Sequence, residues 1–160
     1  MWILKFVLIV VFFLVFFQDY KDRKVYWFLY PIIGAMVFVL QIQSVSIYPA
    51  FINTSFNLVF ISLLLFVSYL YAKYKLQQPL LKEVFGLGDL LFFVSIAFSF
   101  SIVSFLILFV FSLVFSLLLH FTIRYKQTEK TVPLAGYMSL FFATVYGISF
   151  FWESNFLYAY

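Results

Sequence analysis

Residues Leu90–Ile123 read LLFFVSIAFSFSIVSFLILFVFSLVFSLLLHFTI, and these 34 consecutive residues include no Asp, Glu, Lys or Arg. A helix needs about 20 predominantly apolar residues to cross the hydrocarbon core of a bilayer. The stretch is therefore too long for a single crossing. A weak break near Phe98–Ser101 divides it, and we interpret it as two consecutive membrane helices.

The composition of the whole chain supports this interpretation. Of the 160 residues, 66% are hydrophobic, 26% are aromatic and 10% are charged. A soluble domain has about a quarter of its residues charged, so this chain has too few polar side chains for a surface in water. Disorder is excluded because disordered chains are poor in aromatic residues. We find no repeat or linker, and residues 1–160 are predicted to form one transmembrane domain.

Six apolar runs are separated by charged or turn-forming stretches. Six membrane helices need about 120 residues, which leaves enough of this chain for loops. The first run contains Lys5 but ends without a small-residue cleavage site, so we interpret it as a permanent helix and not as a signal peptide. The predicted spans are Trp2–Gln18, Val25–Gln41, Ala50–Ala72, Gly88–Ser99, Ser101–Phe121 and Val132–Trp152.

Nine of the ten cationic side chains fall in alternate loops between these spans. The second loop, Ile42–Tyr48, and the fourth loop carry no charge. The positive-inside rule then predicts that the first, third and fifth loops are cytoplasmic and that both termini lie outside. The predicted fold is an all-α polytopic membrane protein with six transmembrane helices. The cations are Lys21, Arg23 and Lys24, then Lys73, Lys75 and Lys82, then Arg124, Lys126 and Lys130.

The side chains available for chemistry are few. The chain has no cysteine and a single histidine, His120, which we interpret as a helix-end residue near the interface. Thiolate sites, disulfides and a histidine-rich metal centre are thereby excluded, and we predict neither metal nor cofactor. Because topology accounts for the basic loops, we predict no nucleic acid partner and name the lipid bilayer instead.

Three aspartates lie beside predicted membrane boundaries: Asp19, Asp22 and Asp89. An ionisable group in that place is costly unless it has a partner or a function. Asp89 ends the sequence Gly86-Leu87-Gly88-Asp89, in which the two glycines allow a tight turn and a close approach of the backbone. The start of a helix also favours a carboxylate. An ordinary N-cap is the alternative interpretation of Asp89.

This pattern resembles the type IV prepilin peptidase and preflagellin peptidase family of membrane aspartyl proteases. That family has an aspartate at the end of one helix, a short polar stretch, then Ile-Pro-Asn, and a Gly-X-Gly-Asp motif further on. Gly86–Asp89 matches the second motif fully. Asp19, followed by the five residues Tyr20–Lys24 and then Val25, matches the first in part. Val132–Gly136 resembles the Ile-Pro stretch that opens the last helix of the family.

The chain departs from the family pattern at three positions. Tyr26 and Trp27 stand where Pro and Asn are usual, and Leu91 replaces a common lysine. A divergent substrate and lost activity are the two explanations that these departures leave open. The cysteine-containing N-terminal region of the larger enzymes, with its methyltransferase activity, has no counterpart here. The chain therefore resembles the compact, peptidase-only form.

The resemblance implies a membrane aspartic endopeptidase of the bacterial cytoplasmic membrane that needs no metal or cofactor. Its partner would be a prepilin-like or pseudopilin-like precursor of a type IV pilus or protein secretion system, whose leader it removes. Asp19 and Asp89 would form the general acid–base pair, and Gly86 and Gly88 would shape the backbone beside Asp89. Two carboxyl groups in one site suit these roles, because like charges close together push one pKa up.

Asp19 is preferred to Asp22 as the first member of the pair. Asp19 adjoins the apolar run that ends at Phe17-Gln18, whereas Asp22 lies among Lys21, Arg23 and Lys24 as a solvated ion-pair partner. If Asp19 and Asp89 work together, we expect their carboxyl groups to lie within reach of one common water molecule.

Two alternatives stay open. Presenilin and signal peptide peptidase share the Gly-X-Gly-Asp motif, but their two aspartates come from consecutive helices, and Pro133-Leu134-Ala135 has the wrong order for their Pro-Ala-Leu motif. A non-enzymatic assembly or transport subunit belongs to a different class. A transporter should place polar groups near the bilayer midplane, and we expect the spans to contain few of them apart from serine and threonine.

Overall fold

The computed structural model describes residues 2–76, 86–123, 132–151 and 155–158, and within these ranges it is all-helical, without a strand. The predicted all-α class is therefore confirmed for the described residues, and each of the six apolar runs forms a helix. The helices are α1 (Trp2–Asp22), α2 (Leu29–Val45), α3 (Ile47–Tyr71), α4 (Leu87–Ile96), α5 (Ile102–Ile123), α6 (Leu134–Ile148) and the short α7 (Asn155–Tyr158). A π-helical turn, Ala72–Leu76, extends α3.

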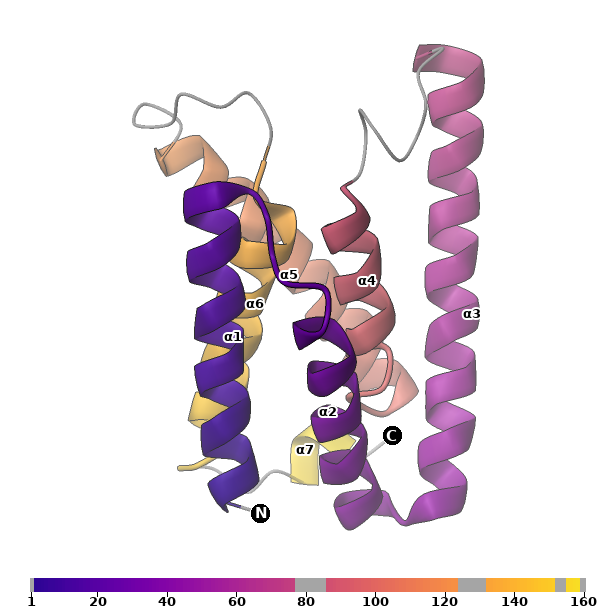
Figure 1. The fold of residues 1–160 in the computed structure, drawn as a ribbon. Helices are drawn as coiled ribbons and strands as arrows, with labels where there is room; N and C mark the ends of the chain where they lie inside the picture. Colours follow the sequence, from indigo (N-terminus) through magenta and orange to yellow (C-terminus); the bar gives the residue numbers. More distant parts are fainter. Residues whose placement is uncertain (1, 77–85, 124–131, 152–154, 159–160) are drawn as a thin grey trace.

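The six longer helices form an up-and-down bundle (Figure 1). α1, α3 and α5 run toward one end, and α2, α4 and α6 run back. α1 packs along α6, α2 packs against α1 and α4, and α3 stands at the edge against α2 and α5. The start of α1 and the short α7 lie at one end of the bundle, whereas α1, α3 and α5 finish at the opposite end (Figure 1).

Three of the helices are long and apolar enough to cross a membrane: α1, α5, and α3 with its extension to Lys75. α2, α4 and α6 are shorter apolar helices. Large apolar side chains cover the outside of the long helices, and Phe66 and Phe111 are each 60% exposed. A continuous apolar exterior suits lipid and not water. These are the features of a membrane protein.

Most predicted span boundaries differ from the helix ends by a few residues; for example, α2 begins at Leu29 and not at Val25. Two of the differences change the loops. α1 does not end at Gln18 but continues to Asp22, because polar residues end an apolar run without ending a helix. The predicted second loop, Ile42–Tyr48, is reduced to Ser46 alone. Ser46 has a φ of 69°, and its N–H donates to the Ile42 carbonyl at 3.0 Å, so the chain leaves α2 and enters α3 through one residue in an unusual backbone conformation.

The predicted break between the fourth and fifth spans is present, since α4 ends at Ile96 and α5 begins at Ile102. Buried carbonyl groups in such a break need hydrogen-bond donors, because no lipid can supply them. The Asn57 amide donates to the carbonyls of Ala97 and Phe100, both at 3.0 Å, and the Gln41 amide donates to Phe100 at 3.0 Å. Both side chains are 1% exposed or less.

Gln41 and Asn57 correct the expectation that the helices contain few polar groups apart from serine and threonine. Thr54 joins them, since its hydroxyl donates to the Gln41 side-chain oxygen at 3.4 Å. The amide donors of Gln41 and Asn57 are used by the backbone of the break. This cluster therefore has a structural explanation and does not by itself indicate a transport pathway.

Lys5 is the one cation outside the three basic loops, and it has a local partner. Lys5 is buried, with 5% of the residue exposed, and its ammonium group donates to the Ser149 carbonyl at 3.1 Å, just beyond the end of α6. It also lies 5.9 Å from the centre of the Phe150 ring. A cation is favourable at the carboxyl end of a helix, so Lys5 fastens the start of α1 to the end of α6.

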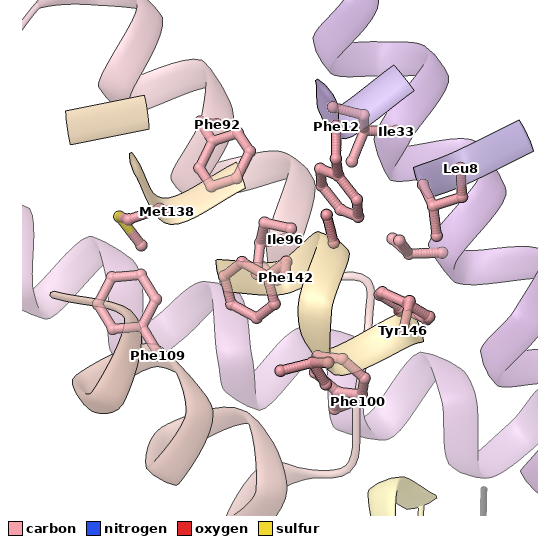
Figure 2. Close-up of a cluster of buried hydrophobic side chains, with 14 of the residues drawn as sticks. Leu8, Phe12, Ile33, Phe92, Ile96, Phe100, Phe109, Met138, Phe142 and Tyr146 are labelled. Atoms are coloured by element: carbon pink, nitrogen blue, oxygen red, sulfur yellow. The ribbon is translucent and has the colours of Figure 1, made fainter. Parts of the chain in front are cut away.

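An aromatic core joins the helices that lie beneath the candidate site (Figure 2). Phe12 of α1, Phe92 of α4 and Phe142 of α6 are fully buried, and their ring centres lie 6.3 Å apart in each pair. Rings at this separation contribute contact energy beyond their buried area. Phe92 follows Asp89 by one helical turn. The packing of these three rings therefore fixes the positions of α1, α4 and α6 relative to one another close to Asp89.

Candidate active site

Asp19 and Asp89 come together at the first turn of α6. Asp19 Oδ2 accepts a hydrogen bond from the Gly136 N–H at 2.7 Å, and Asp89 Oδ1 accepts one from the Ala135 N–H at 2.8 Å. The first amides of a helix have no acceptor within the helix, and the positive end of its dipole attracts carboxylates. Two consecutive amides therefore hold the two carboxyl groups side by side.

α1 supplies the first carboxyl group. Asp19 lies in the last turn of α1 and is partly buried, whereas Asp22, one turn later, is exposed. Because α1 packs along α6, the side chain of Asp19 reaches the amide of Gly136. The placement of these two aspartates agrees with the preference for Asp19 that the sequence indicated.

α4 supplies the second carboxyl group, and both of its oxygens are used. Asp89 is the third residue of α4, and its Oδ2 accepts a hydrogen bond from the N–H of the N-cap residue Gly86 at 3.2 Å. This is the reciprocal half of a capping box. Its Oδ1 bonds to Ala135. Helix capping thus accounts for one oxygen of Asp89 and leaves the other for the contact with α6.

The two glycines of the motif act differently from the prediction. No glycine in the described ranges has a positive φ, so backbone freedom at Gly86 and Gly88 is not what the fold uses. At Gly88 the missing side chain matters, because a Cβ there would lie 2.7 Å from the hydroxyl oxygen of Tyr30. At Gly86 the nearest atom to an added Cβ is Asp89 Oδ2, at 3.3 Å.

Sequence reasoning gave no separate role to Gly136 and missed Tyr30. A Cβ on Gly136 would lie 3.0 Å from both Cβ and Oδ2 of Asp19, tighter than most such contacts, so glycine favours this close approach of α6 to α1. A glycine in the first turn of a predicted helix was an available signal. Tyr30 is 1% exposed and lies close enough to both aspartates to interact with them electrostatically. Nothing in the sequence distinguishes it from the other tyrosines.

Arg23 also belongs to the site, although the sequence indicated a solvated partner of Asp22. Its guanidinium group is close enough to interact with the carboxyl groups of both Asp19 and Asp89. Arg23 follows the last residue of α1 with a φ of 53°, the left-handed conformation common just after a helix. The site therefore combines two carboxyl groups with one guanidinium group.

Within the ranges that the structure describes, no group of three or more His, Cys, Asp or Glu side chains is placed to hold a metal ion. Comparison of the chain with family models, with curated proteins and with solved structures found no match. Paired carboxyl groups at a helix start can accept and donate protons, which is the requirement of acid–base hydrolysis.

Proposed function

We propose that this chain is a membrane aspartic endopeptidase in which Asp19 and Asp89 form the acid–base pair. One observation carries the proposal: carboxyl groups from α1 and α4 accept hydrogen bonds from consecutive amides, Gly136 and Ala135, at the start of α6. Capping a single helix start needs only one carboxylate. Two carboxyl groups at one helix start, each from a different helix, are better explained by a shared role in catalysis than by capping.

Peptide hydrolysis by this pair requires one proton shared between the two carboxyl groups. The ionised carboxylate takes a proton from a water molecule while the water oxygen bonds to the carbonyl carbon. The protonated carboxyl group gives its proton to the carbonyl oxygen, forming a tetrahedral diol. A proton then passes to the amide nitrogen, the C–N bond breaks, and the products are a carboxylic acid and an amine. The pair ends with one proton, as it began.

The substrate that we propose is the leader of a prepilin-like precursor, following the resemblance of Gly86–Asp89 and Asp19–Val25 to the prepilin peptidase family. Such leaders end at the boundary of a hydrophobic helix. The aspartate pair lies toward the end of the bundle where α1 and α3 finish (Figure 1). A bond at the boundary of a substrate helix would reach that level in the membrane.

We further propose a bacterial cytoplasmic membrane location with six crossings and both termini outside. The alternating directions of α1 to α6 support this topology. Lys21 and Arg23, and then Lys73 and Lys75, lie at the same end of the bundle as the aspartates. Lys82 and the cations of the fifth loop, Arg124, Lys126 and Lys130, lie outside the described residues.

The arrangement favours the prepilin peptidase family over the presenilin alternative. Asp19 lies on α1 and Asp89 on α4, so two helices separate the aspartates along the chain. In the presenilin family they come from consecutive helices.

Co-expression with a precursor tests the proposed function directly. The precursors would be a panel of prepilin-like proteins, each with a short basic leader that ends in glycine. We expect the wild-type chain to shorten at least one precursor by the length of its leader, visible as a shift on a gel and as a new N-terminus by sequencing. Wild-type protein that is present in membranes yet shortens none of the panel would contradict the proposal.

Cysteine labelling tests the topology, because the chain has no native cysteine. Single cysteines inserted after residues 45, 78 and 127 would be treated with a membrane-impermeant reagent in intact cells and in lysed cells. We expect labelling from outside after residue 45, and labelling only after lysis at the other two positions. If positions 45 and 78 react from the same side, the six-crossing topology is wrong and the aspartates cannot share one membrane face.

A further inference from the structure

We propose that the hydroxyl group of Tyr30 is a further catalytic group, which donates a hydrogen bond to the carbonyl oxygen of the peptide bond being cleaved. This inference rests on the proposed peptidase function and adds a residue to that same site. It also gives the carbonyl oxygen a second hydrogen-bond donor, which stabilises the negative charge on that oxygen while the proton is being transferred from the protonated carboxyl group.

The burial of Tyr30 is the first observation. Tyr30 is the second residue of α2 and is 1% exposed, yet its hydroxyl group has no hydrogen-bond partner within the described residues. A buried hydroxyl without a partner is unfavourable, whereas phenylalanine would fill the same space at no such cost. A tyrosine in this place is explained if an atom of a ligand completes the hydrogen bond.

The direction of the hydroxyl group is the second observation. It lies against Gly88, where an added Cβ would come within 2.7 Å of the oxygen, and Gly88 immediately precedes Asp89. The ring is held edge-on by Phe92, with ring centres 6.5 Å apart. Both carboxyl groups of the pair act electrostatically on the Tyr30 hydroxyl. The hydroxyl therefore lies beside the aspartate pair, where we place the substrate.

Four backbone amides at the site are already used, which is the third observation. The N–H groups of Ala135 and Gly136 bond to Asp89 and Asp19, and the N–H of Gly86 bonds to Asp89. The amide of Leu134, at the start of α6, donates to the Val132 carbonyl at 2.9 Å. None of these four amides is therefore free to hold the substrate oxygen. Tyr30 keeps its proton throughout the reaction and only donates a hydrogen bond.

The test compares Tyr30→Phe with the wild-type protein in a purified cleavage assay. Loss of one oxyanion donor lowers kcat by about 10²- to 10³-fold, so we expect a fall of that size, with KM changed by less than about threefold. The thermal midpoint in detergent should stay the same or rise, because the hydroxyl has no partner in the folded protein. Tyr146→Phe is the matched control, because Tyr146 is a fully buried tyrosine near the other end of α6. We expect this variant to cleave at the wild-type rate.

A second measurement uses a leader peptide with a statine residue at the cleavage site, which imitates the tetrahedral intermediate. We expect Tyr30→Phe to weaken binding of this peptide by at least about tenfold more than binding of the unmodified peptide. Equal weakening of both peptides, or a Tyr30→Phe variant that cleaves at the wild-type rate, would overturn the role of Tyr30 alone. A wild-type protein that cleaves no precursor would instead overturn the peptidase function and this role together.

Discussion

Asp19→Asn and Asp89→Asn should each abolish leader cleavage, with rates reduced by about 10²- to 10⁴-fold or more. Asparagine keeps the size of aspartate, and its amide oxygen can still accept the hydrogen bond from Gly136 or Ala135. The fold should therefore survive, while the side chain can no longer exchange a proton. The measurement is the gel shift of a co-expressed precursor, with the membrane level of each variant determined by immunoblot.

Asp22→Asn is the matched control for this prediction. Asp22 lies one turn beyond Asp19 on α1, but it is exposed. Charges on exposed side chains contribute little to stability, so we expect this variant to cleave nearly as well as the wild type. An inactive Asp22→Asn together with an active Asp19→Asn would show that the first aspartate of the pair is assigned wrongly.

Gly136→Ala should cause the next largest loss. Its new Cβ would lie 3.0 Å from the Cβ and Oδ2 atoms of Asp19, which is tighter than most Cβ contacts in proteins. The Asp19 side chain must then shift by a few tenths of an ångström, and its 2.7 Å hydrogen bond to Gly136 is lengthened. Misplacement of a catalytic group by about 1 Å can reduce the rate about 10²-fold, and we expect a loss of about 10- to 10²-fold in cleavage.

Gly147→Ala separates this effect from a general response of α6 to alanine. Gly147 belongs to the same helix, and an added Cβ there would have no atom within 4 Å. Alanine also favours a helix over glycine by about 1 kcal/mol, so Gly147→Ala should cleave normally and unfold at the same or a higher temperature. If both alanine variants cleave at the wild-type rate, the close contact of Gly136 with Asp19 is not needed for cleavage.

The helices could be predicted from the sequence, because a helix that crosses a bilayer needs a long uncharged run. The break at Phe98–Ser101 could be predicted because the uncharged run around it is too long for one crossing. The exact helix ends could not be predicted. The residues from Asp19 to Asp22 are mostly polar but compatible with a helix, so α1 continues beyond the end of its apolar run. The chain reverses at Ser46, which has a φ of 69°. A serine in a sequence gives no indication of this backbone conformation.

The candidate site was predictable to the extent that its residues belong to motifs. Asp19 and Asp89 stood out by their position beside apolar runs and by their resemblance to a family pattern. Their contacts with Gly136 and Ala135 depend on how α1, α4 and α6 pack, which no local pattern encodes. Tyr30 could not be singled out because 26% of the chain is aromatic. In the folded protein it is distinguished by a buried hydroxyl that lacks a hydrogen-bond partner and interacts electrostatically with both aspartates.

The use of α6 to hold both carboxyl groups has a consequence for biosynthesis. Gly136 is 117 residues further along the chain than Asp19. At about 5–20 residues per second, a ribosome needs roughly 6 to 23 s to travel that distance. Until α6 has emerged and joined the bundle, Asp19 and Asp89 lack the amides that hold them together. If the chain is the peptidase that we propose, the nascent chain is therefore inactive, and a precursor inserted beside an unfinished copy would not be cleaved until synthesis is complete.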